Sequence, residues 1–111
     1  MKKLLMFPTV CALALPASTQ PAYDWQISGV HITAIEATYM PTAVLFTIDT
    51  NAGSCGTGSW LKWNTIDADQ ATAQANNKAI YALLLASKLG GSTVRLFGSN
   101  PGCLVKFIYS S

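Results

Sequence analysis

The single histidine of the chain, His31, is the first residue to consider for acid–base chemistry. The pKa of a histidine lies close to neutral pH, so His31 could act as a general base. A catalytic base also needs an oriented second group within hydrogen-bond distance. The residues that surround His31 in the sequence supply no such group. We therefore interpret His31 as a surface residue or a hydrogen-bonded residue.

Other residue types that could support catalysis or bind a metal also have simpler explanations. Asp67 and Asp69 could chelate a cation, but carboxylates also favour the start of a helix, and an alanine-rich stretch follows them. Gly53, Gly56 and Gly58 do not lead from a strand into a helix, as the glycines of a phosphate-binding loop do. No Gly-x-Ser-x-Gly nucleophile motif is present. We predict no catalytic residue, no metal site and no cofactor, and hence a protein that is not an enzyme.

The amino terminus has the charge and hydropathy pattern of a secretory signal peptide. The basic residues Lys2 and Lys3 precede an apolar run at 4–15, and small or turn-forming residues follow at 16–18. The run is shorter than the ~20 residues that span a bilayer. We predict a signal peptide at 1–22, cleaved between residues 17 and 22. The expected location is periplasmic or secreted, without membrane insertion.

Removal of the signal peptide changes the net charge. The remaining basic residues are Lys62, Lys78, Lys88, Arg95 and Lys106, and the acidic ones are Asp24, Glu36, Asp49, Asp67 and Asp69. The mature chain is therefore close to neutral. Binding of single-stranded nucleic acid, which needs a basic groove, is not expected.

Two cysteines, Cys55 and Cys103, remain after cleavage, because Cys11 leaves with the signal peptide. Exported proteins meet an oxidising environment, in which such a pair forms a disulfide. A catalytic thiol or metal ligand is the alternative, but no second histidine or nearby cysteine completes a metal site. We predict a Cys55–Cys103 disulfide that contributes about 4 kcal/mol in the chain-entropy description.

Hydrophobic periodicity predicts the secondary structure of residues 23–111, which we assign to one domain. Strands are expected at 30–39, 43–50 and 59–64, a helix from about residue 71 to Gly90 and Gly91, and strands at 93–97 and 104–109. This order matches a mainly β (α+β) fold, the five-stranded oligonucleotide/oligosaccharide-binding (OB) barrel, with one helix between strands three and four. The helix would close one end of the barrel through a face made of Ala75, Ala79, Ile80, Leu83, Leu84 and Ser87.

Three segments of the sequence resemble a family of small exported proteins of Gram-negative bacteria. They read CGTGSWLKWN, NNKAIYALLLASKLGGSTVRLFGS and GCLVKFIY, and the resemblance covers residues 30–109. The family is similar in architecture to the binding (B) subunits of subtilase cytotoxin and typhoid toxin, which are barrel-fold pentamers that recognise sialylated glycans. The resemblance implies an OB-like barrel, a homo-oligomer and carbohydrate binding. It does not place the glycan-contacting residues of the toxins on this chain.

The third predicted strand contains the strongest candidates for ligand contact. If Leu61 and Trp63 face the core, Trp60 and Lys62 face outward, because alternate residues of a strand lie on opposite faces. An exposed indole ring could stack on a sugar or on a partner protein. Alternatively, Trp60 packs under a loop or under the start of the mature chain, near Trp25.

Arg95, on the fourth predicted strand, completes the set of candidate ligand-binding residues with Trp60 and Lys62. It could pair with an acidic ligand or be a solvated surface arginine. We predict a small exported, non-enzymatic binding domain that binds a glycan as the toxin B subunits do. The alternative is a periplasmic structural or protein-interaction protein that binds another exported protein through a strand edge or in an oligomer.

Overall fold

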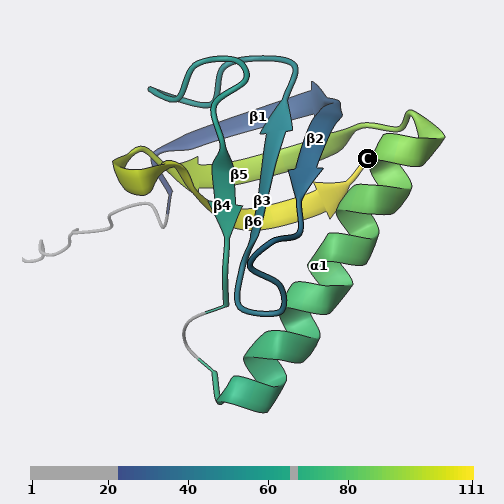
Figure 1. Ribbon diagram of the computed structural model, residues 1–111. Helices are drawn as coiled ribbons and strands as arrows, with labels where there is room; N and C mark the ends of the chain where they lie inside the picture. The colour runs from purple at the N-terminus through teal and green to yellow at the C-terminus, as the bar shows by residue number, and fades with distance from the viewer. Residues whose placement is uncertain (1–22, 66–67) are drawn as a thin grey trace, which may run out of the picture.

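The computed structural model describes residues 23–65 and 68–111, so the predicted signal peptide at 1–22 and Asp67 lie outside the described residues. The strands, in chain order, are β1 (Trp25–Val30), β2 (Ile32–Glu36), β3 (Val44–Ile48), β4 (Leu61–Trp63), β5 (Val94–Ser99) and β6 (Leu104–Ser110). The long helix α1 (Gln70–Gly90) lies between β4 and β5, and a short 3-10 helix, η2 (Pro101–Cys103), precedes β6. The fold is mainly β, as predicted (Figure 1).

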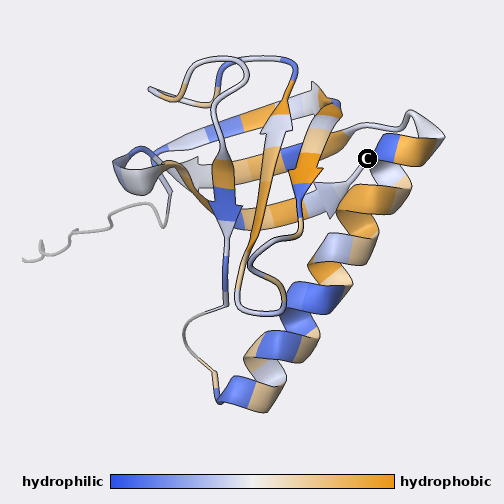
Figure 2. Cartoon of the chain, viewed as in Figure 1, coloured by the Kyte–Doolittle hydropathy of each residue, from blue (hydrophilic) through white to orange (hydrophobic). Residues whose placement is uncertain are grey.

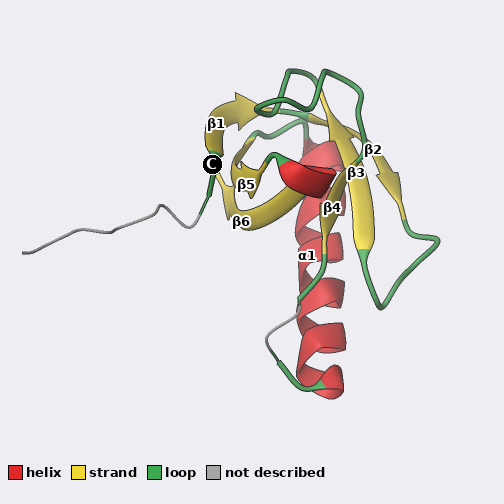
Figure 3. Ribbon diagram, turned by 90° about the vertical axis from the view of Figure 1, so that its left-hand side faces the viewer, coloured by secondary structure: helices red, strands yellow, loops and turns green. Residues whose placement is uncertain are grey.

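The described strands form one six-stranded sheet in the order β1-β5-β6-β4-β3-β2. Its two edge strands, β1 and β2, are separated along the chain by only His31. The sheet must therefore curl to bring these edges to the same part of the molecule, and Figure 3 shows the resulting half-barrel. The β4–β6 pair is parallel, and the other neighbouring strands are antiparallel.

The predicted number of five strands is wrong for the described residues, which contain six. The strand predicted at 30–39 begins earlier, at Trp25, and is interrupted at His31. Gly29 has a φ of +68°, a conformation that glycine adopts without steric cost, and the register with β5 shifts between Ile27 and Val30. The two halves pair with different partners, β5 and β3. The helix consequently follows the fourth strand and not the third.

The hydrophobic core lies between the curled sheet and the helix. On β3, Val44, Phe46 and Ile48 are buried as the alternating pattern predicts. Thr47 is also buried, and its hydroxyl lies 2.6 Å from the hydroxyl of Thr33. The largest apolar side chains with almost no exposed area come from β3, β4, α1 and β5: Phe46, Leu61, Leu84, Leu96, Val44 and Val94.

The helix starts and stops where the sequence predicts. Asp69 is the N-cap residue, and its side chain accepts a hydrogen bond from the main-chain N–H of Thr72. Gly91 ends the helix with a φ of +68°, and its main-chain N–H donates to the carbonyl oxygen of Lys88. The predicted strands at 43–50, 59–64, 93–97 and 104–109 correspond to β3, β4, β5 and β6, although β5 continues through Ser99.

The prediction of the buried helix face is wrong in part. Leu84 and Ser87 are buried and Ile80 packs against the core, as expected. Ala75 and Ala79, in contrast, are exposed. An α-helix turns ~100° per residue, so Ala75, nine positions before Leu84, lies on the opposite side of the helix. Figure 2 shows in addition that the amino-terminal half of the helix is mostly hydrophilic and projects beyond the sheet.

The predicted disulfide is confirmed. Cys55 and Cys103 are bonded, with their Cα atoms 6.1 Å apart, and 48 positions separate them in the sequence. Cys55 lies in the loop before β4, and Cys103 is the last residue before β6. Within the ranges 23–65 and 68–111, no helix combines the length and apolar character required to cross a membrane.

Candidate functional site

The structure exposes both Trp60, the residue directly before β4, and Lys62 on β4. Leu61 is 1% exposed and Trp63 packs against the core, whereas Trp60 is 47% exposed and Lys62 is exposed. The alternative in which Trp60 packs under a loop is therefore wrong. Trp60 and Lys62 lie on the same face, about 7 Å apart along the strand direction.

Lys62 lines a surface hollow of about 240 Å³ together with Tyr39, Thr42, Ala43 and Leu45. We call this feature the Tyr39–Lys62 hollow. Leu45 is the direct partner of Lys62 in the β3–β4 ladder, and the other lining residues belong to the loop between β2 and β3. The lining is mostly apolar, and the Tyr39 side chain is 55% exposed at its edge.

The loop that supplies Tyr39 is held by hydrogen bonds. The main-chain N–H groups of Thr42 and Ala43 both donate to the carbonyl oxygen of Tyr39, at 2.8 and 3.2 Å. The loop also contains a cis peptide bond between Met40 and Pro41. The two hydrogen bonds to the Tyr39 carbonyl oxygen hold the loop that displays the tyrosine ring.

Asn77 connects this loop to the helix. Its side chain is 1% exposed, and Nδ2 donates to the carbonyl oxygens of Pro41 at 2.8 Å and Thr42 at 2.9 Å. Its Oδ1 accepts from the main-chain N–H and the hydroxyl of Thr65, both at 3.1 Å. Because one buried amide satisfies four partners, Asn77 positions the β2–β3 loop against both α1 and the end of β4.

Sequence analysis did not identify Tyr39 or Asn77. Asn77 shares the helical spacing of the buried residues Leu84 and Ser87, and an amide on a buried face suggests a hydrogen-bonding role. Tyr39 follows β2 in a loop, where its contribution to a hollow depends on the fold of the loop and leaves no periodic pattern.

Arg95 lies away from the hollow, on β5, which is separated from β4 by β6. Its guanidinium carbon is 5.1 Å from the centre of the Tyr109 ring, a cation–π contact. Tyr109 belongs to an aromatic cluster in which the ring of Phe97 has edge-to-face neighbours, with centroid distances of 4.8 to 5.9 Å; the neighbours are Tyr23, Phe107 and Tyr109. Thus the structure brings Trp60 and Lys62 together and places Arg95 in a separate group.

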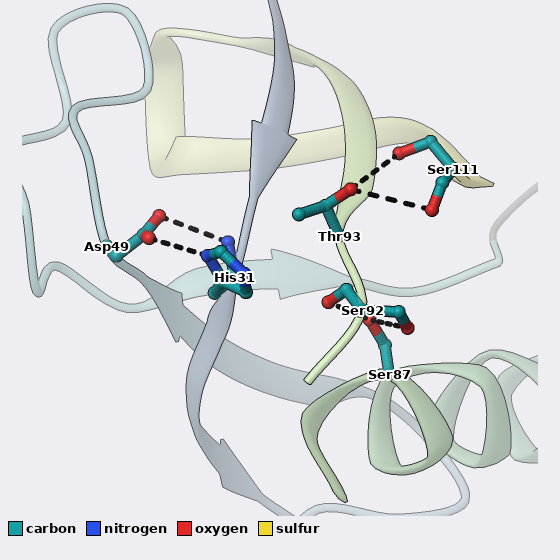
Figure 4. A network of polar contacts seen from close by, with 6 residues as sticks. All are labelled: His31, Asp49, Ser87, Ser92, Thr93 and Ser111. Carbon is teal, nitrogen blue, oxygen red and sulfur yellow. Dashed lines mark hydrogen bonds and ion pairs between the residues drawn. The ribbon is translucent and has the colours of Figure 1, made fainter. Parts of the chain in front are cut away.

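His31 has a partner that the sequence did not reveal. Figure 4 shows the pair: Nδ1 of His31 lies 3.0 Å from Oδ2 of Asp49, and the main-chain N–H of His31 donates to Oδ1 at 3.1 Å. Two contacts with His31 lower the pKa of Asp49 below its ordinary value of 3.8. The hydrogen bond from the main-chain N–H has the larger effect, and the contact with the ring has the second largest. Both side chains are substantially exposed, at 51% and 42%.

The surroundings of this pair bear on acid–base chemistry. Across the described ranges, the His31 ring makes no hydrogen bond to a hydroxyl or thiol group that it could activate. The other contacts in Figure 4 join Ser87 to Ser92 and Thr93 to Ser111. In the same part of the chain, no group of three or more His, Cys, Asp or Glu residues is arranged to hold a metal ion. The contact between His31 and Asp49 joins the residue between β1 and β2 to the residue that follows β3.

This chain matches no protein-family model, no curated protein and no solved structure.

Proposed function

We propose that the protein is a small exported, non-enzymatic glycan-binding domain whose contact surface is the Tyr39–Lys62 hollow and the adjacent Trp60. The observation that carries the proposal is an apolar hollow lined by the exposed Tyr39 and by Lys62, with the exposed Trp60 two positions before Lys62 in the chain. The hollow is open to solvent, so that part of a longer glycan could enter it.

The chemistry of these side chains fits a sugar. A sugar ring has an apolar C–H face and a rim of hydroxyl groups, and an aromatic ring matches that face while its O–H or N–H matches the rim. Lys62 adds an ammonium group with three donors for hydroxyl or carboxylate oxygens. A concave, mostly apolar site with few polar groups is also the usual form of a small-molecule site.

The strand pairing supports the finer fold assignment that accompanies this proposal. If β1 and β2 are the two halves of one bent strand, the element order becomes three strands, a helix and two strands. That is the order of an OB-like barrel, a fold that binds oligosaccharides among other ligands. The homo-oligomer implied by the resemblance to toxin B subunits is part of the same proposal.

A glycan array followed by calorimetry tests this function. We expect binding to a subset of glycans, and Trp60→Ala and Tyr39→Ala should each weaken it by roughly 5- to 30-fold, the loss of ~1–2 kcal/mol. Arg95→Gln is the control, because it changes a predicted contact residue outside the hollow. Absence of binding across a broad array by correctly folded protein would contradict the proposal, and so would Trp60→Ala and Tyr39→Ala variants that bind glycans as tightly as the native protein.

The aromatic cluster favours a second candidate function, self-association of an exported interaction protein. Phe107 and Tyr109 are 41% and 45% exposed, next to Arg95, and aromatic residues and arginine are enriched at protein interfaces. Light scattering of the mature protein should then give a multiple of the monomer mass that Phe107→Ser with Tyr109→Ser reduces to the monomer. A monomeric native protein would exclude this candidate.

A further inference from the structure

A second pocket lies where β4 separates from β6. Its volume is about 280 Å³, and its lining consists of Trp63, Asn64, Thr65, Asn76, Leu104, Val105 and Lys106. The parallel ladder between the two strands contains the single pair Lys62 and Leu104. Beyond that pair, β6 continues through Ser110 whereas β4 ends at Trp63 and the chain leads toward the helix. The resulting gap in the sheet is the space that we call the β4–β6 pocket.

The lining of the β4–β6 pocket is rich in hydrogen-bond donors. Asn76 accepts a hydrogen bond from the hydroxyl of Thr65 through its Oδ1, so the two N–H donors of its Nδ2 are directed away from Thr65. Asn64 adds a second amide, and Lys106 adds an ammonium group. No carboxylate is found among the described lining residues. From these described lining residues, an incoming ligand meets one positive charge and several donors.

Trp63, which also lines the β4–β6 pocket, carries a further donor, its indole N–H. Its Nε1 is buried and has no hydrogen-bond partner among the described residues. A buried donor without an acceptor is unfavourable, because it has lost its hydrogen bond to water and gained none in return. An oxygen atom that approaches this edge of the ring, after a small adjustment of the side chains that cover it, would provide the missing acceptor.

We propose that the β4–β6 pocket binds a small hydroxylated carboxylate of the size of one hexuronate. Lys106 receives the carboxylate, the amides of Asn64 and Asn76 donate to hydroxyl oxygens, and the partly buried ring of Trp63 forms an apolar wall. The volume of about 280 Å³ corresponds to roughly nine water molecules at ~30 Å³ each, enough for one such ligand. This site is separate from the Tyr39–Lys62 hollow and does not depend on glycan binding there.

Titration of the oxidised mature protein with D-galacturonate, D-gluconate and the neutral sugar D-galactose tests the proposal. NMR spectra of the indole N–H groups follow the binding, and Trp63→Phe assigns the cross-peak of Trp63. We expect at least one of the two acids to shift this cross-peak saturably, and D-galactose to bind at least 10-fold more weakly. Lys106→Gln should weaken acid binding at least 10-fold, whereas Lys78→Gln, which changes an exposed helix lysine outside the lining, should leave it unchanged.

Three results would overturn the proposal. They are no shift of the Trp63 cross-peak with either acid, the same dissociation constant for Lys106→Gln as for the native protein, and a shift of the Trp60 cross-peak alone. The last result would assign the binding to the hollow. Persistence of the Trp63 response in Trp60→Ala would separate this site from the proposed glycan surface.

Discussion

Trp25 on β1 lies directly opposite Gly98 on β5, and its indole ring fills the space that a Cβ atom at position 98 would occupy. Gly53, in the loop after β3, approaches the other part of the same ring. The ring is only 7% exposed although it lies close to the start of the described chain. Trp25 thus anchors β1 between two segments that lack side chains at the points of contact.

Replacement of Gly98 by alanine should therefore destabilise the fold. The new methyl group would meet both the Trp25 ring and the main-chain oxygen of Leu104, and the backbone oxygen cannot rotate away. Overpacking of this kind lowers the free energy of unfolding by about 1–3 kcal/mol. Gly56→Ala is the matched control, because the nearest atom to its new methyl group, Oγ of Ser59, is 4.0 Å away. Urea denaturation measures both, and equal midpoints for the two variants would show that the ring does not require Gly98.

Asn77→Asp should be one of the more damaging conservative changes in the chain. The new carboxylate would replace the Nδ2 donor with an acceptor that faces the carbonyl oxygens of Pro41 and Thr42, at a position that is 1% exposed. We expect the free energy of unfolding to fall by about 2–4 kcal/mol, since a buried acceptor then faces two other acceptors.

The neighbouring residue provides the control for this substitution. Asn76 uses its Oδ1 as an acceptor from Thr65, a role that an aspartate can retain, so Asn76→Asp should change stability little. Thermal unfolding compares the two variants. An Asn77→Asp protein as stable as Asn76→Asp would mean that the β2–β3 loop is not held through this amide.

Removal of the disulfide should lower the free energy of unfolding by about 4 kcal/mol, on the chain-entropy scale for a loop of 48 positions. Cys55→Ala with Cys103→Ala makes this change without a reductant, and chemical denaturation measures it. Dithiothreitol should lower the stability of the native protein and leave the double variant unaffected. If the reductant has the same effect on both proteins, its action does not come from this bond.

The stability of the protein should depend on the charge of Asp49 in acid. Its pKa is lowered in the folded state, mainly by the main-chain N–H of His31, so the unfolded chain binds a proton at a higher pH than the folded one. The stabilisation is therefore complete above the ordinary pKa of 3.8 and is lost as the pH falls through the lower folded value.

Asp49→Asn tests this dependence, because the amide keeps an acceptor for the His31 N–H and removes the charge. At pH 7 we expect a loss of roughly 0.5–1 kcal/mol, small because both side chains are exposed. The difference from the native protein should shrink as the pH falls below the folded pKa of Asp49, because the native side chain then also loses its charge. Glu36→Gln is the control. A difference that persists unchanged in strong acid would rule out the carboxylate charge as its source.

The elements that the sequence predicts well are those with local patterns. The apolar alternation of Val44, Phe46 and Ile48 identifies β3, and Asp69 and Gly91 identify the two ends of α1. The disulfide is predicted from the number of cysteines together with the predicted export of the chain. Each of these features depends on neighbouring residues or on simple counting, and not on the tertiary fold.

The features that the sequence did not predict depend on contacts between distant segments. β1 contains Gln26, Ser28 and Gly29, which give it no apolar pattern typical of a strand. Its conformation depends instead on pairing with β5 and on the burial of Trp25. The exposed side of α1 contains alanines such as Ala75. Because alanine is small and apolar, it would suit a buried face equally well. In the candidate site, Trp60 and Lys62 follow from strand alternation. Tyr39 joins them only through the folding of the β2–β3 loop.

The positions of the cysteines have a consequence for the rate of folding. β4 and β6 form the parallel pair of the sheet, through Lys62 and Leu104, which are 42 positions apart along the chain (104 minus 62). Lys62 lies seven positions after Cys55, and Leu104 is the next residue after Cys103. Through the disulfide, the path between the paired residues is therefore far shorter, and contacts of low effective sequence separation form faster. The oxidised chain should consequently close this parallel strand pair early, whereas a chain that reaches the same fold before oxidation must bring together two residues 42 positions apart to form it.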